Sequence, residues 1–221
     1  MKYLFASAAA LAVAGPACAQ EFTLKPVAEA RLRYEHAQQD GLAEDESDAL
    51  TVRARAGLTA SSGGLSATMV GQGTLAIVDD YYDGLNGAAT RPIVADPQNV
   101  ALYIAQLQYR TSALTLTGGR QKIALDDERF VGNVAFRDNG QTFDAVRAEL
   151  TPLRGLKLDI AYAWSVRTIW GIDGVGARQQ AIGGDNLFAN LSYATPLGTI
   201  TGFAYLVDQD EAAVQAYRLS S

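Results

Sequence analysis

Cysteine and histidine are almost missing from this chain of 221 residues, which contains one of each. The cysteine, Cys18, lies in an N-terminal stretch that has the features of a secretory signal peptide. These are a positive charge at Lys2, an apolar run over residues 4–14 that is too short to span a bilayer, and an Ala-Cys-Ala cleavage site at residues 17–19. We predict a signal peptide over residues 1–19 and a mature chain without disulfides or reactive thiols. The alternative, a lipoprotein anchored through Cys18, is disfavoured by the poor Gly-Pro-Ala sequence before it.

Basic residues and long hydrophobic runs are also scarce. Removal of Lys2 leaves 17 of the 18 basic side chains, against 24 acidic ones, and this balance argues against nucleic acid as a natural partner. No later segment has the ~18 uncharged apolar residues of a transmembrane helix. If the mature chain enters a membrane, it must therefore cross with strands.

Apolar and polar residues alternate with a period of two along much of the chain, which predicts β-strands. Residues 156–167 show the pattern most clearly, and residues 27–34 and 50–59 repeat it. Most of the predicted strands have ten or more residues, a length that suits a tilted bilayer crossing better than a soluble sheet. Noisier segments of the same kind cover residues 64–77, 99–110, 113–123, 142–151, 186–194 and 198–207, with a tenth strand beginning near Val214.

The connections between these strands alternate in length. Short turns are predicted at residues 61–64, 111–112, 151–155 and 195–198, and long polar loops at residues 37–48, 79–98, 124–141 and 168–185. Short turns on one side and long loops on the other are typical of outer-membrane barrels. We therefore predict an all-β fold, an antiparallel transmembrane up-and-down β-barrel over residues 20–221, located in the cell outer membrane with its lipid as a partner.

Two of the long loops are acidic, and a third is unusually apolar. Glu44, Asp45, Glu46 and Asp48 lie in the first loop, and Asp79, Asp80 and Asp83 in the second. Solvated loop acids are a more common explanation of such runs than a divalent-cation site, and we predict no metal and no cofactor. The third loop carries Phe130, Val131, Val134 and Phe136 among its polar residues. We expect it to fold inward and narrow the pore; packing against the barrel rim is the alternative.

Cations gather on the polar face of the predicted strands, which in an outer-membrane barrel faces the lumen. Guanidinium groups lining a narrow pore would attract and pass anions. The alternative is that the arginines pair with acids on neighbouring strands, namely Glu29, Glu35, Glu149 and Asp159. Ion pairing and a surplus of positive charge can occur together. The predicted pore-lining or solute-contacting residues are Arg31, Arg33, Arg53, Arg55, Arg110, Arg120, Lys122, Arg129, Arg137, Arg147 and Arg167.

One stretch resembles the alginate-export family of outer-membrane proteins. The likeness lies in Gly-Arg-Gln at residues 119–121, Asp-Glu-Arg-Phe-Val-Gly-Asn at 127–133 and Gln-Thr-Phe-Asp-Ala-Val-Arg at 141–147, with Arg-Leu-Arg-Tyr-Glu at 31–35. The resemblance implies a barrel of about eighteen strands whose cation-lined lumen exports an acidic polysaccharide such as alginate. It also implies periplasmic export components as partners. The resemblance would place three arginines among the substrate contacts: Arg120, Arg129 and Arg147.

The sequence departs from that family in strand number, because only nine strands and the start of a tenth are predicted. The chain also ends in Ser220-Ser221, where outer-membrane barrels commonly have an aromatic residue in the last strand. We interpret the chain as the N-terminal part of a larger barrel. The alternatives are a general diffusion porin for small solutes and a truncated fragment without function.

Two further classes of protein fit less well. An outer-membrane phospholipase or protease needs a nucleophile with a positioned base, and the sole histidine, His36, has no G-x-S-x-G or HExxH motif beside it. We predict no enzymatic activity. A soluble periplasmic β-sandwich or an adhesive domain would have shorter strands, although Tyr162, Trp164 and Tyr193 would suit either a sandwich core or a barrel exterior.

Overall fold

The computed structural model describes residues 21–210 and 217–220, so the predicted signal peptide lies outside the described residues. The chain forms one antiparallel sheet in which every strand pairs with its neighbours in chain order. This architecture confirms the predicted all-β, up-and-down fold. The strands are β1 (Phe22–Gln38), β2 (Glu46–Ser62), β3 (Leu65–Asp80), β4 (Asn99–Arg110), β5 (Leu114–Gln121), β6 (Thr142–Leu153), β7 (Leu156–Arg167), β8 (Ala181–Thr195), β9 (Gly198–Val207) and β10 (Tyr217–Ser220), with a short 3-10 helix, η1 (Gly176–Arg178), before β8.

The strand boundaries correct the prediction in three places. The turn expected over residues 151–155 is shorter, because β6 continues to Leu153 and a register shift between Leu150 and Leu153 absorbs the intervening proline. The first long loop is shorter too, since Glu46 and Asp48 are strand residues of β2. The fourth long loop ends at residue 180, where β8 begins.

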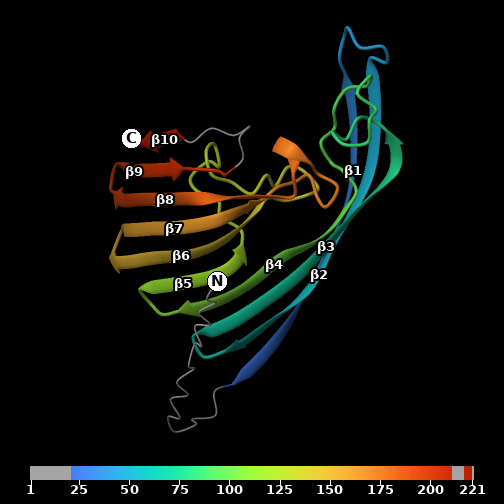
Figure 1. Cartoon of the computed structure of the whole chain (residues 1–221). Helices are drawn as coiled ribbons and strands as arrows, with labels where there is room; N and C mark the ends of the chain where they lie inside the picture. The colour runs from blue at the N-terminus through green and yellow to red at the C-terminus, as the bar shows by residue number, and fades with distance from the viewer. Residues whose placement is uncertain (1–20, 211–216, 221) are drawn as a thin grey trace, which may run out of the picture.

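The sheet curves around a hollow, and its connections are sorted by length (Figure 1). Short turns join the strands at one end and long loops at the other, as predicted. Strands β1, β2 and β3 have 16 or 17 residues and extend beyond the rest at the long-loop end. In the part of the chain that the structure describes, β1 and β10 are the two edges of the sheet and do not pair with each other.

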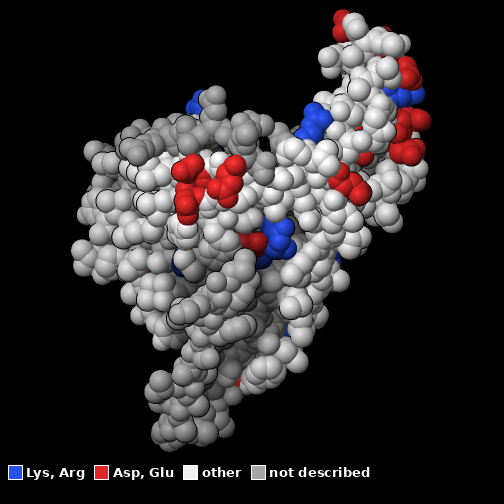
Figure 2. All heavy atoms as spheres, in the orientation of Figure 1, with Lys and Arg blue, Asp and Glu red and all other residues white. Residues whose placement is uncertain are grey.

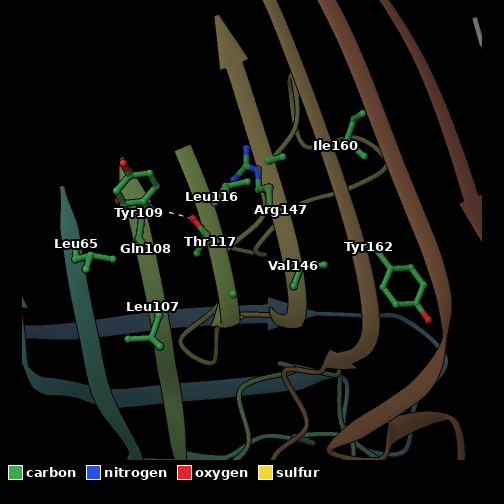
Figure 3. Close-up of a pocket in the computed structure, with 12 residues that line it drawn as sticks. Leu65, Leu107, Gln108, Tyr109, Leu116, Thr117, Val146, Arg147, Ile160 and Tyr162 are labelled. Carbon is green, nitrogen blue, oxygen red and sulfur yellow. Dashed lines mark hydrogen bonds between the residues drawn. The ribbon is translucent and has the colours of Figure 1, made fainter. Parts of the chain in front are cut away.

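The convex face of the sheet is covered with exposed apolar side chains. One cross-strand row runs from Leu107 past Gly118 and Val146 to Tyr162. Around it lies a shallow apolar hollow of about 480 Å³, shown in Figure 3, where Gly118 leaves the wall without a side chain. An apolar surface this extensive is rare on soluble proteins and suits contact with hydrocarbon.

The aromatic residues that fitted two fold classes also lie on the convex face. Tyr162, Trp164 and Tyr193 are 40 %, 43 % and 52 % exposed, which excludes a sandwich core as their environment. Among the described residues, no helix is long and apolar enough to cross a membrane.

The core of the fold lies inside the curve of the sheet. Ile123, Leu125 and Val131, from the segment between β5 and β6, are buried against Phe143 and Phe188 on the concave face of β6–β9. The two phenylalanine rings meet edge to face with centroids 5.8 Å apart. Because this segment occupies the hollow that the strands enclose, the apolar part of the loop has its own packing partners.

Candidate solute pathway

The segment 122–141, here called the inner loop, folds back into the hollow of the sheet, which confirms the inward folding predicted for the third long loop. Its far end reaches the inner face of β2 and β3, where the Asn139 side-chain oxygen accepts hydrogen bonds from Thr74 at 2.9 Å and Gln72 at 3.2 Å. The inner loop therefore spans the concave face from β9 to β2 and takes up part of the hollow.

Asp138 anchors this loop to the first two strands. Its carboxylate is fully buried, accepts a hydrogen bond from the Thr51 hydroxyl and lies 3.6 Å from Arg31 Nε. Arg53 donates to its backbone carbonyl at 3.3 Å. Arg31 also donates to backbone carbonyls of the inner loop, including that of Phe136 at 3.0 Å. Two predicted pore-lining arginines thus hold the loop in place.

Asp96, from the long loop between β3 and β4, supplies a second anchor. Its fully buried carboxylate pairs with Arg33 and, at 3.4 Å, with Arg137 of the inner loop. Both arginines also contact Glu35, so this group contains two cations and two anions. The positive and negative charges of this group therefore balance.

Tyr81, directly after the end of β3, supports the same anchor. Its hydroxyl donates to the Asp96 carbonyl at 2.9 Å, and its ring is buried between Ala49 and Val94. Burial, followed by the nearby charges of Asp83 and Asp96, raises the pKa of Tyr81 well above that of a free tyrosine. The hydroxyl therefore stays protonated and remains a donor.

Arg53 and Arg55 on β2 share one carboxylate, that of Glu29. Arg55 also donates from Nε to Gln72 at 2.7 Å, and its guanidinium lies 3.8 Å from the ring centroid of Tyr103. Both arginine side chains are largely buried. One acid for two cations leaves this cluster with a net positive charge.

Arg120 and Arg167 show the same imbalance, because both pair with Asp144. Arg120 binds this carboxylate with two bonds of 2.8 and 2.9 Å, and Arg167 Nε lies 3.1 Å from it. The two arginines line a pocket of about 260 Å³ together with Gln72 and Tyr103. The pocket therefore lies between the two clusters with excess positive charge and is the best-formed place for an anion on this face.

Arg147 is balanced in the way the pairing alternative predicts. It binds Asp159 with bonds of 2.6 and 2.8 Å and contacts Glu149 at 3.4 Å, and Lys157 joins the same two acids. Two cations here meet two anions, so Arg147 braces β6 against β7.

The remaining predicted residues form no ion pair with any residue that the structure describes. Arg110, near a short turn, donates to Gln108 at 3.2 Å. Lys122 lies 5.9 Å from the ring centroid of Tyr103, and Arg129 lies 5.9 Å from that of Phe130. Lys122 thus adds to the charge near the pocket, whereas Arg129 lies on the other side of the inner loop.

Three acids that matter most for this arrangement were not predicted from the sequence: Asp96, Asp138 and Asp144. Strict alternation puts Asp144 on the face opposite Arg147, yet its carboxylate pairs with Arg120 and Arg167 beside a register shift between β6 and β7. Tyr103 was missed for the same reason, since the pairing of β3 with β4 shifts next to it. Asp96 and Asp138 lie in loops, where no periodicity indicates direction.

The single histidine belongs to none of these clusters. His36 Nδ1 lies 3.0 Å from Asp48, and both side chains are about half exposed. Across residues 21–210 and 217–220, no group of three or more His, Cys, Asp or Glu side chains is arranged to hold a metal ion.

Comparison with known proteins adds one strong similarity of fold. No family model matches the chain, and no curated protein matches its sequence. The structure is similar to that of OccAB1 from Acinetobacter baumannii, with a TM-score of 0.60 and 13 % identity over 85 % of this chain and 45 % of that one. A BenF-like porin from Pseudomonas fluorescens Pf-5 matches with a TM-score of 0.49 and 13 % identity, over 90 % and 61 %.

The chain thus spans a little under half the length of OccAB1. At 13 % identity the likeness concerns the fold alone, and neither comparison bears on alginate. The sheet described here has the architecture of an up-and-down β-barrel wall, with an apolar convex face and an arginine-rich concave one.

Proposed function

We propose that this chain forms part of an outer-membrane channel that passes anionic solutes. The observation that carries the proposal is the charge on the concave face next to the pocket. Arg53 and Arg55 share one acid, and Arg120 and Arg167 share another, so cations outnumber anions around the pocket. A net positive lining attracts anions and repels cations.

The opposite faces of the sheet support a position in the membrane. Exposed leucine, isoleucine, valine and aromatic side chains cover the convex face, while buried and paired charges cover the concave one. A sheet with this asymmetry is stable with hydrocarbon on one side and water on the other.

A more specific version of this proposal is that the anionic solute is an acidic polysaccharide, as expected from the alginate-export resemblance. The pocket near Arg120 suits a carboxylate, but it would accept the carboxylate of a small molecule as well as that of a uronate unit. General diffusion of small anions therefore fits the geometry equally well. Block of the channel current by uronate oligomers, without block by neutral ones, would favour the polysaccharide.

The test of the proposal is ion selectivity in planar bilayers. In a potassium chloride gradient, the reversal potential of the purified protein should lie closer to the equilibrium potential of chloride than to that of potassium. Replacement of both arginines that share Asp144, Arg120→Gln with Arg167→Gln, should lower the chloride-to-potassium permeability ratio by about twofold or more. Because Asp144 would then lose its partners, Asp144→Asn is added. The three changes together remove one net positive charge from the concave face.

A matched control comes from Arg154, an exposed arginine in the short turn between β6 and β7. Arg154→Gln removes one cation from the molecule but none from the concave face, so the permeability ratio should stay unchanged. Cation selectivity of the unaltered protein, or an equal effect of the control, would contradict the proposal.

A further inference from the structure

An aromatic platform stands apart from the arginine clusters, on the other side of the inner loop. It consists of Phe130 from the loop and of Phe203 and Tyr205 from β9. Phe203 and Tyr205 stack with ring centroids 4.7 Å apart and an interplanar angle of 24°, and Phe130 lies 5.7 Å from Phe203. Tyr205 is buried, so Phe130 and Phe203 supply the accessible apolar surface on the concave face.

Tyr205 belongs to the core and Phe203 packs against it, but the platform continues beyond the core to Phe130. The neighbouring rings of Phe143 and Phe188 are almost completely buried, whereas half of the Phe130 side chain is exposed. The platform borders a cavity of about 360 Å³, a size within the ~300–1,000 Å³ of small-ligand sites. A large apolar ring held against an open cavity is a common sign of a binding surface.

Polar groups of both kinds surround the cavity. Asp126 and Asp127 offer carboxylate oxygens, and Arg129 and Thr201 offer donors. Asp126 is fixed in position, because it accepts hydrogen bonds from the Asn190 side chain at 2.6 Å and the Tyr205 hydroxyl at 3.3 Å. The rim can therefore accept and donate hydrogen bonds around one flat apolar face.

We infer that the aromatic platform binds the pyranose ring of a neutral sugar. The C–H face of such a ring is apolar and would lie on Phe130 and Phe203, while its hydroxyls, each a donor and an acceptor, would use the mixed rim. Two carboxylates against one guanidinium disfavour an anionic ligand. A purely cationic ligand would leave the donors at Arg129 and Thr201 without a role.

This inference goes beyond the anion channel proposed above and depends on it only for a water-filled concave side. It gives the two sides of the inner loop different preferences: the pocket beside Arg120 attracts negative charge, and the aromatic platform takes uncharged rings.

The experiment is a binding measurement on the whole protein in detergent, by saturation-transfer NMR with maltotriose as the neutral probe and tri-galacturonate as the acidic one. Maltotriose should bind more tightly than tri-galacturonate. Phe130→Ala should weaken maltotriose binding about tenfold, and Phe130→Trp, which retains a flat ring, should preserve it. Asp127→Asn should reduce the difference in affinity between maltotriose and tri-galacturonate, because it removes one negative charge from the rim.

Phe136→Ala is the matched control, because Phe136 is an exposed phenylalanine of the same loop that lies against Arg33 and Arg137 instead. It should leave maltotriose binding unchanged. Equal loss in both alanine variants, tighter binding of tri-galacturonate, or binding of choline in preference to either sugar would overturn the inference. Heat-modifiable gel migration reports folding of each variant, and ion selectivity, measured separately, shows whether the channel proposal survives such a result.

Discussion

Single carboxylates decide which cations of the concave face remain available. Asp159 and Glu149 neutralise Arg147, whereas Asp144 alone serves Arg120 and Arg167. A buried ion pair contributes little net stability on average, but removal of one partner leaves a costly unpaired charge. The acids of this face are therefore positioning residues for the arginines and for the inner loop.

Asp138 gives the sharpest test at this scale. Asp138→Ala removes a fully buried carboxylate from Thr51 and Arg31, and the loss should weaken attachment of the inner loop by about 3–5 kcal/mol. Trypsin should then cleave faster after Arg129 in the folded protein. Asp127→Ala, which changes an exposed acid of the same loop, should leave the cleavage rate near that of the unaltered protein. A stable loop in the Asp138 variant would show that the carbonyl contacts of Arg31 are sufficient.

At the scale of the strand, irregularities set the direction of the important side chains. Tyr103 is the extra residue at a register shift of β4 against β3, and Asp144 lies beside a similar shift of β7 against β6. Each shift moves later residues to the other face, since the side-chain period of a strand is two. These irregularities therefore help to form the pocket beside Arg120 and Tyr103.

Two adjacent glycines of β5 make this point testable. Gly119 has a φ of 106°, and a Cβ there would come within 2.4 Å of the Ala105 carbonyl oxygen. Gly119→Ala should therefore cost about 1–3 kcal/mol, seen as a lower urea midpoint of unfolding. Gly118 faces outward with its nearest neighbour, Val146 Cγ1, at 3.9 Å. Gly118→Ala should be neutral or stabilise by up to about 1 kcal/mol. Similar midpoints for both variants would mean that the backbone of β5 relaxes freely.

At the scale of the whole molecule, the two ends of the sheet differ in charge and shape. Figure 2 shows acidic side chains gathered on the protruding end that β1–β3 form in Figure 1. Exposed acids of this end include Asp40, Glu44, Asp45, Glu46, Asp79 and Asp80. In outer-membrane barrels the long loops face outward and the short turns face the periplasm, so we expect this acidic end outside the cell.

Cysteine labelling on intact cells tests that orientation. Asp45→Cys, in the loop between β1 and β2, should react with a membrane-impermeant maleimide. Leu197→Cys, in the fully exposed short turn between β8 and β9, should react only after the outer membrane is permeabilised. The reverse pattern would invert the orientation, and equal labelling of both in intact cells would contradict a membrane-spanning sheet.

Alternation of residue types was sufficient to predict the strands, their order and the two faces of the sheet. Such information is local: a strand shows its period in its own residues, and long loops show themselves by polarity. Even so, residues 151–155 were predicted as a turn, since Pro152 interrupts the pattern without ending β6. Arginines such as Arg53 and Arg120 could be assigned to the concave face from the sequence. The net charge that remains after they pair with acids could not be predicted.

That charge depends on contacts between residues far apart in the sequence. Arg33 meets Asp96 across 63 positions, and Thr51 meets Asp138 across 87. No periodicity connects a loop acid to a strand arginine, because the distance between them is fixed only when the sheet curves and the inner loop folds into it. The division of the concave face into neutral anchors, a positive pocket and an aromatic platform is for this reason a property of the tertiary structure.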